Sequence, residues 1–221
     1  MAASTDTVKL TYFDGRGVIE PTRIMLSIAK VSYEDFRYPI DISIYSKPEF
    51  DAAKAEGKFA LNMGRAPLFE INGVEIAQSK TIDRYVARKY GFSGDSDIEA
   101  AHIDMIAEHV SDIKKSYGDA RSGKKGDEAA AAKSEWLSTK LPEWTGKLEA
   151  SIAMLGGTGG FSVGKKLSYA DIRLYEMTCD FFDDKDAAAA AIASCPKISA
   201  SVDAVKSAAA DWLASRPVTA I

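Results

Sequence analysis

The chain has 221 residues, of which 46% are hydrophobic and 27% charged, a composition that fits one large globular domain or two small ones. Its net charge of −4 argues against nucleic acid or an anionic membrane as the main partner, since both bind basic surfaces. No apolar run reaches the roughly 18 residues of a membrane span, and residues 1–7 lack the apolar core of a secretory signal, so we expect a cytoplasmic protein. Cys179 and Cys195 match no zinc-site spacing, which predicts two reduced thiols and no metal.

The opening of the chain predicts a β-α-β unit. Residues 9–13 are rich in strand-forming side chains, and residues 33–38 are expected to form a second strand. Between them, residues 18–29 carry apolar side chains at helical intervals, with Pro21 where a first helical turn tolerates it. Because a helix connects the two strands, we expect the strands to be parallel.

A hairpin and a helix complete the first predicted domain. Residues 67–77 place an Asn-Gly dipeptide between two short apolar runs, which is the strongest local signal for a tight β-hairpin. A short helix is expected over residues 48–56 and a longer one over residues 79–90. We therefore expect an α/β domain with a small mixed sheet.

The strand signals stop at a connection rich in glycine and aspartate, residues 91–97, which marks the predicted domain boundary. Beyond it, apolar residues recur at helical spacing. We therefore divide the chain into an α/β domain of residues 1–90 and an all-helical domain of residues 98–221. The helices of the second domain are expected at residues 98–117, 124–155 with a kink at Pro142, 167–182, 186–193 and 196–213.

Tyr12 lies near the end of the first predicted strand, just before a turn that contains glycine. A side chain at such a strand end lies at the crevice where α/β folds bind ligands, and a tyrosine hydroxyl there can donate a hydrogen bond. The alternative is an ordinary strand aromatic, since tyrosine is common in strands.

The stretch from Gly64 to Pro67 precedes the hairpin. A cis peptide bond before Pro67 would turn the Ala66 backbone outward and leave its N–H and C=O groups free for a peptide-like ligand. The alternative is a trans proline at a strand entry, which is the commoner case.

Gln78 and Ser79 lie between the hairpin and the next helix. Ser79 fits the role of a helix N-cap, which is a structural function. The same position suits ligand binding, because a helix N-terminus offers free N–H groups and a favourable dipole to a carboxylate. Ser168 and Asp171 fit a capping box, which we interpret as structural.

Taken together and in order, four segments resemble those of one family. They are TYFDGRGVIEPTRIML near the start, GRAPLFEINGVEIAQSKTIDRYVARKYG in the middle, LSYADIRLYE late in the chain and DWLASRPVTAI at its end. The chain is similar to the cytosolic glutathione transferases, above all to the tyrosine-type sigma class and its glutathione-dependent prostaglandin D synthase relatives. The resemblance covers nearly the whole chain.

The resemblance implies a fold, a co-substrate and a mechanism. The fold is a thioredoxin-like N-terminal domain followed by an all-α C-terminal domain, usually in a homodimer. Glutathione is the co-substrate, and Tyr12 falls on the catalytic tyrosine that holds its sulfur as a thiolate. The second substrate is a hydrophobic electrophile, expected near Met105 and Tyr117. The other positions implied to bind glutathione are Phe13, Lys54, Arg65, Ala66, Pro67, Gln78, Ser79 and, across a dimer, Asp104.

Two departures from the family pattern bear on activity. Val18 stands where family members have an arginine that supports the catalytic tyrosine, and Arg16 lies two positions too early to replace it. The tryptophan and lysine of the family's loop after the second strand have no clean match, although Phe50 and Lys54 lie in that region. Two alternatives therefore stay open: a glutathione-dependent isomerase or peroxidase, and a non-catalytic glutathione- or ligand-binding protein on the same fold.

Overall fold

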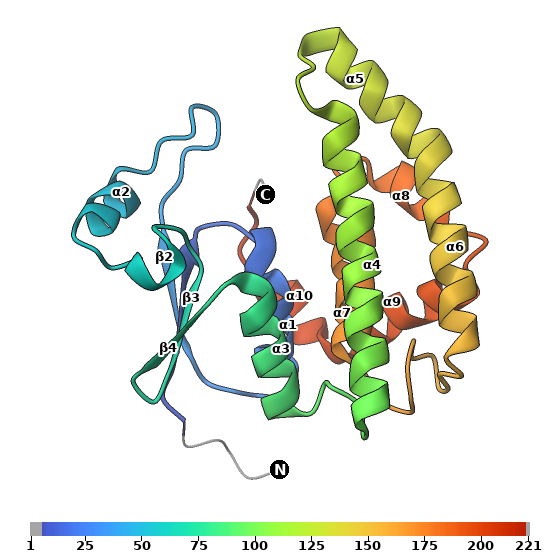
Figure 1. Cartoon of the computed structure of the whole chain (residues 1–221), viewed down its shortest axis with the longest axis horizontal. Coiled ribbons are helices and arrows are strands. Elements are labelled where there is room, and N and C mark those ends of the chain that lie inside the picture. Colours follow the sequence, from blue (N-terminus) through green and yellow to red (C-terminus); the bar gives the residue numbers. More distant parts are fainter. Residues whose placement is uncertain (1–5, 220–221) are drawn as a thin grey trace. The chain divides into compact units, whose positions relative to one another are not determined.

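The computed structural model describes residues 6–219, which form two compact units. One unit runs to Tyr90 and also includes the chain from Asp211 onward, while the other spans Gly91–Ala210. The sequence-based division assigns residues 211–219 to the helical domain, whereas the structure groups them with the N-terminal unit. Within the described residues, no helix is both long and apolar enough to cross a bilayer. Figure 1 labels the elements of each unit.

A four-stranded mixed sheet forms the centre of the N-terminal unit. Its strands are β1 (Val8–Phe13), β2 (Glu34–Tyr38), β3 (Leu68–Ile71) and β4 (Val74–Ala77), in the spatial order β2-β1-β3-β4. β1 and β2 are parallel, which confirms the predicted β-α-β unit. β3 is antiparallel to both β1 and β4, which confirms the predicted hairpin.

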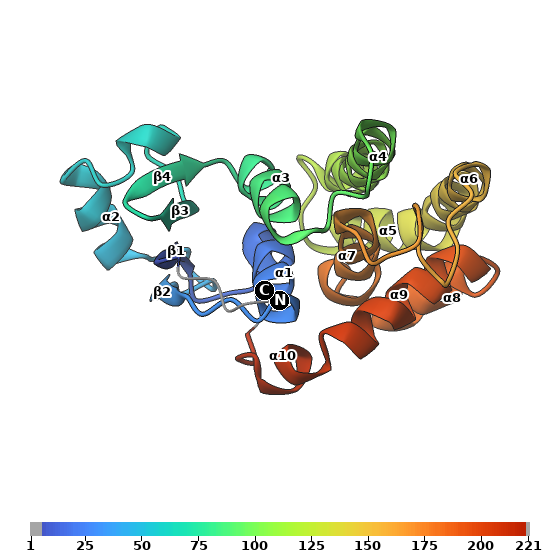
Figure 2. The ribbon, with the colours of Figure 1, turned by 90° about the horizontal axis from the view of Figure 1, so that it is seen from below.

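Three helices pack against this sheet. They are α1 (Glu20–Ile28), α2 (Pro48–Ala55) and α3 (Ser79–Tyr90), accompanied by the 3₁₀ turns η1 (Gly17–Ile19) and η2 (Ala60–Asn62). α1 and α3 lie side by side on one face, and α2 lies on the other side of the sheet (Figure 2). The last helix of the chain, α10 (Ala210–Ser215), leads into the C-terminal segment of the same unit.

The alternation of strand residues explains this layering. Leu10 and Phe69 are fully buried, as expected for the face under α1 and α3. Their neighbours Lys9 and Glu70 point to the opposite face, where they line an open hollow.

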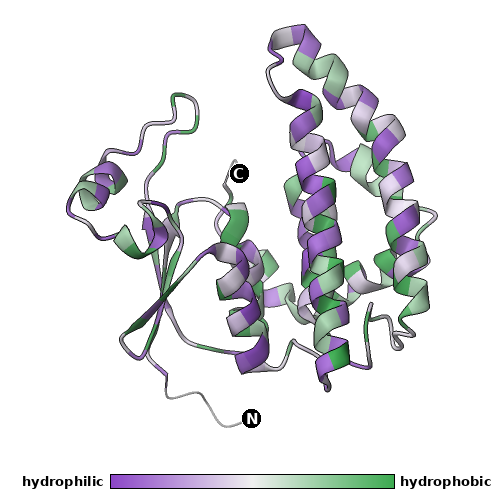
Figure 3. Ribbon diagram, viewed as in Figure 1, coloured by the Kyte–Doolittle hydropathy of each residue, from purple (hydrophilic) through white to green (hydrophobic). Residues whose placement is uncertain are grey.

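The second unit is all-helical, as predicted. Its elements are α4 (Asp97–Arg121), α5 (Gly126–Glu135), η3 (Trp136–Lys140), α6 (Leu141–Met154), α7 (Tyr169–Tyr175), η4 (Glu176–Phe181), α8 (Lys185–Ile192) and α9 (Pro196–Ala208). Hydrophilic and hydrophobic residues alternate along α4 and α6 (Figure 3), the pattern of helices that bury one face. On α4 the buried face includes Ile103, Ile106, Val110 and Ile113.

The predicted helical region over residues 124–155 runs without a break from α5 through η3 to α6, but its hydrogen-bond pattern changes before Pro142. The chain makes a wide π turn, η3, in which the Leu141 N–H donates to the Trp136 C=O. Pro142 then stands in the first turn of α6, directly after this π turn. The irregularity therefore lies in the turn before the expected kink, where the N–H that Pro142 lacks cannot continue the regular helical hydrogen bonds.

The predicted capping box at the start of α7 is confirmed. The backbone N–H and the hydroxyl of Ser168 both donate to one carboxylate oxygen of Asp171 at 2.8 Å. The other oxygen accepts the Ser162 N–H at 2.7 Å. All three residues are buried, so the box ties the preceding loop to the helix.

Candidate functional site

Strand register brings the three predicted glutathione-binding segments to one edge of the sheet. Leu68, at the start of β3, pairs with Thr11 of β1 on one side and with Ala77 of β4 on the other. The next residues toward that edge are Tyr12, Pro67 and Gln78. Side chains and backbone groups from all three segments can therefore contact one ligand.

The side chain of Tyr12 is half-buried, and its hydroxyl lies against the backbone of Gly17. A β-carbon built on Gly17 would lie 2.7 Å from that hydroxyl, and the φ of +47° at Gly17 also favours glycine. Burial raises the pKa of Tyr12, while a backbone hydrogen bond from Val18 and the charge of Arg23 act in the opposite direction. The phenol therefore keeps its proton at neutral pH and can act as a hydrogen-bond donor.

The loop before β3 offers a free peptide unit. The Ala66–Pro67 peptide bond is cis, as the resemblance implies. The Asn62 side chain is buried, and its Nδ2 donates to the Pro67 C=O at 2.9 Å, which holds the loop in place. Within residues 6–219, neither backbone polar group of Ala66 has a protein partner. The exposed Lys54 lies over the same loop, since a β-carbon on Gly64 would be 2.8 Å from its Cε.

Gln78, and not Ser79, is the N-cap of α3. The Gln78 C=O accepts the N–H groups of Thr81 and Ile82 at 2.9 Å, so Ser79 is the first helical residue, and its N–H belongs to the unpaired first turn. Gln78 has a φ of +70°, which is uncommon for a residue with a side chain and concentrates at functional sites. In the described chain neither side chain hydrogen-bonds to protein, so both are available to a ligand.

Aromatic rings support this edge of the sheet. Phe13, another predicted glutathione contact, has its ring centroid 5.2 Å from that of Tyr12 and 4.8 Å from that of Phe50. Phe50 in turn packs on Phe59, in a buried cluster that Ala66 also contacts. The loop and the strand end are thus fixed against one core.

Of the other four predicted site residues, one lies in the loop before β3 and three lie on α4. Arg65 is exposed beside the loop, and Asp104 and Met105 are half-buried on α4. Tyr117, also on α4, is only 4% exposed. Its ring contacts Trp136, Phe181 and Phe182. This burial disfavours the prediction that Tyr117 lines a substrate pocket.

Sequence analysis missed a buried charged network next to the site. Arg23 on α1 is fully buried, and its Nη1 donates to the Gly15 C=O at 2.6 Å. Its Nε lies 3.2 Å from Asp35, and its Nη1 lies 3.6 Å from Glu20. Arg23 is therefore the positive charge that acts on Tyr12. The sequence feature that could have predicted this network is the pair of opposite charges at Glu20 and Arg23, three residues apart in a helix that is otherwise largely apolar.

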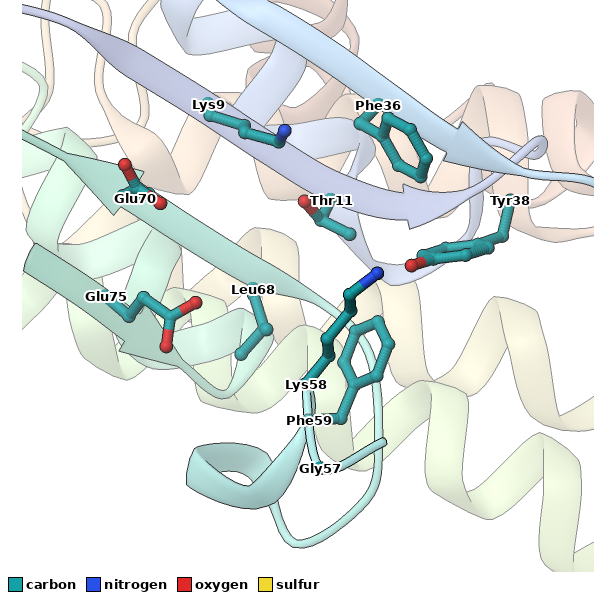
Figure 4. A pocket seen from close by; sticks show the side chains of 10 residues that line it. All are labelled: Lys9, Thr11, Phe36, Tyr38, Gly57, Lys58, Phe59, Leu68, Glu70 and Glu75. Atoms are coloured by element: carbon teal, nitrogen blue, oxygen red, sulfur yellow. The ribbon is translucent and has the colours of Figure 1, made fainter. Parts of the chain in front are cut away.

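A hollow of about 500 Å³ opens on the sheet face opposite α1 and α3 (Figure 4). Its wall includes Phe36 and Tyr38, and Lys9 at its rim is ion-paired with Glu34 at 2.9 Å. Glu70 also lines it, but none of the residues predicted to bind glutathione does. The hollow is therefore distinct from the edge that carries Tyr12.

Cysteine and metal chemistry has little support in the described chain. Within residues 6–219, no group of three or more His, Cys, Asp or Glu side chains could hold a metal ion. Cys179 and Cys195 are unbridged, and burial raises the pKa of both thiols. A protonated thiol is a poor nucleophile.

Family models match both units. The model for the glutathione S-transferase N-terminal domain matches residues 8–88, and that for the C-terminal domain matches residues 111–216. The chain belongs to the glutathione S-transferase family. This glutathione S-transferase uses glutathione as its co-substrate, and the matched N-terminal domain is the part that binds it.

Individual relatives agree with this assignment. The transferase is 31% identical over 168 residues to a glutathione S-transferase of Dirofilaria immitis, covering 76% of this chain and 74% of that one. It is 32% identical over 168 residues to glutathione S-transferase P 1 of Xenopus laevis, with the same coverage of the two chains, 76% and 74%.

Solved structures confirm the fold. A monomeric glutathione S-transferase of the hookworm Necator americanus superimposes with a TM-score of 0.76 at 29% identity, covering 97% of this chain and 100% of that one. A prostaglandin synthase D of Nilaparvata lugens gives a TM-score of 0.76 at 26% identity, covering 96% and 100%. The transferase therefore has the expected thioredoxin-like domain and all-helical domain.

Proposed function

We propose that this transferase activates glutathione through Tyr12, whose neutral hydroxyl donates a hydrogen bond to the sulfur and stabilises the thiolate. The observation that carries the proposal is a half-buried phenol, kept protonated, at the sheet edge that also presents a free peptide unit and an open helix start. The thiolate then attacks a hydrophobic electrophile, with Met105 on α4 as a candidate contact.

One hydrogen bond can supply the free energy needed to lower the pKa of the glutathione thiol. A free thiol has a pKa of about 8.5, so only a few per cent is ionised at neutral pH. Lowering that pKa by about two units requires about 2.7 kcal/mol of preferential stabilisation of the thiolate. A hydrogen bond to a charged acceptor contributes about 1.5–3 kcal/mol, so the Tyr12 hydroxyl is sufficient.

The neighbouring groups anchor the tripeptide. The free N–H and C=O of Ala66 pair with the cysteinyl peptide unit, and Phe13 forms part of the wall. The γ-glutamyl carboxylate binds at the start of α3, where Gln78 and Ser79 offer unpaired polar groups beside the positive end of the helix dipole. The exposed cations Lys54 and Arg65 complement the negative charge of the ligand.

The test is conjugation of glutathione to chlorodinitrobenzene by wild type and by Tyr12→Phe. We expect kcat/KM at neutral pH to fall about tenfold to 100-fold, because the thiolate fraction falls by that order, while the glutathione Kd changes little. Tyr85→Phe is the control, since it removes a hydroxyl from another half-buried tyrosine of the same unit. Full activity in Tyr12→Phe would refute the proposed role.

A glutathione-dependent isomerase is the second candidate. It is favoured by the structural similarity to the prostaglandin synthase D of Nilaparvata lugens. The same thiolate would react with the substrate, but glutathione would act as a cofactor and would be released unchanged after each turnover. Measuring glutathione consumption with an endoperoxide substrate separates the two activities.

We also propose that the chain belongs to the tyrosine-type, sigma-like class and forms a homodimer. The tyrosine at the end of β1 supports the class. In the dimer, Asp104 on α4 would reach the glutathione bound by the other subunit. Since one structural neighbour is described as monomeric, the assembly needs its own measurement.

A further inference from the structure

The C-terminal segment contacts the N-terminal unit at a buried carboxylate. Glu20, the first residue of α1, is only 1% exposed. Its Oε1 accepts hydrogen bonds from Trp212 Nε1 and Arg216 Nη1, each at 2.9 Å. A buried carboxylate is costly unless it is paired and hydrogen-bonded, so these two donors account for its placement.

The second oxygen of Glu20 faces Arg23, which reaches the loop between β1 and α1. Glu20 Oε2 lies 3.6 Å from Arg23 Nη1. The same nitrogen donates to the Gly15 C=O at 2.6 Å and lies 3.5 Å from the Arg16 C=O. Asp35 on β2 holds the other edge of the guanidinium through Nε and Nη2. Arg23 therefore joins the buried carboxylate to the backbone of this loop.

The loop in turn touches the Tyr12 hydroxyl. Gly17 follows the two carbonyl groups that Arg23 holds, and its backbone lies directly against the Tyr12 hydroxyl. The Val18 backbone also acts on this hydroxyl, since it opposes the rise that burial causes in the pKa of Tyr12. The C-terminal segment also contacts the loop directly, because Arg16 Nη2 donates to the Thr219 C=O at 3.2 Å.

We propose that the segment from Trp212 to Thr219 is a clamp that fixes the loop of residues 15–18 against the Tyr12 hydroxyl, with Glu20 and Arg23 as the positioning residues between them. This inference rests on the proposed role of Tyr12 in holding the sulfur. The hydrogen bonds of the clamp lie at the start of α1 and in the loop before it, whereas the groups proposed to anchor the tripeptide lie before β3 and at the start of α3. Releasing the clamp should therefore affect the ionisation of bound glutathione more than its affinity.

A second contact of the same segment provides a control. Lys30 Nζ and Asp211 Oδ2 are 3.3 Å apart, but their side chains are 73% and 89% exposed. Exposed ion pairs contribute little to stability, and this one does not reach the loop. It joins the turn after α1 to the first turn of α10 and includes no residue of the Glu20 network.

The experiment compares Arg216→Met, Trp212→Phe and the control Lys30→Met in the full chain. Three quantities are measured: the pKa of the bound glutathione thiol from the pH dependence of kcat/KM, the glutathione Kd, and the exchange rate of the Val18 amide. For Arg216→Met we expect a thiol pKa higher by about half a unit or more, which is about a threefold loss of thiolate. We expect Val18 exchange to be about tenfold faster or more, and the Kd to stay within about twofold. For Trp212→Phe, the thiol pKa and the Val18 exchange rate should change in the same direction but by less. For Lys30→Met, all three quantities should match those of wild type.

The outcomes distinguish a segment that positions the loop of residues 15–18 from one that only stabilises the fold. An unchanged thiol pKa and unchanged Val18 exchange would overturn the inference, even if the melting temperature fell. If Arg216→Met does not fold, Trp212→Phe decides the question, because it keeps the Arg216–Glu20 bond and removes only one donor. Tyr12→Phe is measured in parallel. An unchanged thiol pKa in Tyr12→Phe refutes the proposed function, while Val18 exchange still tests the clamp on its own.

Discussion

At the scale of single residues, a backbone group and a buried cation act on Tyr12. The Val18 side chain is 45% exposed, while the Val18 backbone acts to lower the pKa of Tyr12. The positive charge that acts on Tyr12 comes from Arg23 in the interior. The absence of an arginine at position 18 therefore leaves the tyrosine with electrostatic support, supplied from another element.

Gly17→Ala should impair catalysis beyond its effect on stability. The new β-carbon would lie 2.7 Å from the Tyr12 hydroxyl, so the ring must move, and a displacement near 1 Å can cost up to about 100-fold in rate. We expect kcat to fall about tenfold or more. Gly73→Ala is the matched control, because its φ of +80° imposes similar backbone strain but no atom lies within 4 Å of the added carbon. Equal kinetics in the two variants would contradict the prediction.

At the scale of elements, local sequence patterns correctly predicted the structures that depend on local interactions. The parallel strand pair and the hairpin follow from a helical crossover and an Asn-Gly turn, and both occur in the structure. The π turn at Trp136–Lys140 lies just before Pro142, where a kink is expected, whereas the π turn at Glu176–Phe181 left no readable signal, since a π turn widens a helix without changing its composition.

The capping box is an element-scale contributor to stability. Asp171→Ala removes the acceptor of three donated hydrogen bonds, two from Ser168 and one from Ser162, in a buried position. We expect the free energy of unfolding to fall by about 1–3 kcal/mol, measured by urea denaturation. Asp186→Ala in the first turn of α8 is the control, because that carboxylate is exposed, and it should cost less than about 0.5 kcal/mol. Similar losses of unfolding free energy in both variants would show that the capping box contributes no more to stability than an exposed carboxylate does.

At the scale of the whole molecule, the site residues differ in how far the sequence could identify them. Tyr12, Ala66 and Gln78 could be predicted as site residues because each lies in a segment whose motif is contiguous in the sequence. The bond from Trp212 to Glu20 joins residues 192 positions apart, and no local pattern couples them. Glycine spacing, caps and hairpins are local properties, whereas a clamp between chain ends exists only in the folded unit.

The proposed homodimer, in which each subunit contributes to the glutathione site of the other, predicts a role for Asp104 in glutathione binding. If α4 of one subunit reaches the glutathione of the other, Asp104→Asn should raise the glutathione Kd about threefold to tenfold by removing a charged hydrogen-bond partner. Asp112→Asn, an exposed carboxylate on the same helix, should leave the Kd unchanged. Isothermal titration gives the Kd, and sedimentation equilibrium gives the assembly. A monomeric protein with wild-type affinity in Asp104→Asn would contradict the shared site.

The most direct measurement is the ionisation of the bound thiol itself, followed by the ultraviolet absorbance of the thiolate as pH is varied in the glutathione complex. Because burial raises the pKa of Tyr12 above its ordinary value of about 10, the phenol remains a donor throughout the range in which the thiol titrates. We predict a midpoint about two units below the value of about 8.5 for a free thiol in wild type, and a midpoint close to the free value in Tyr12→Phe. Equal midpoints in the two proteins would contradict the account.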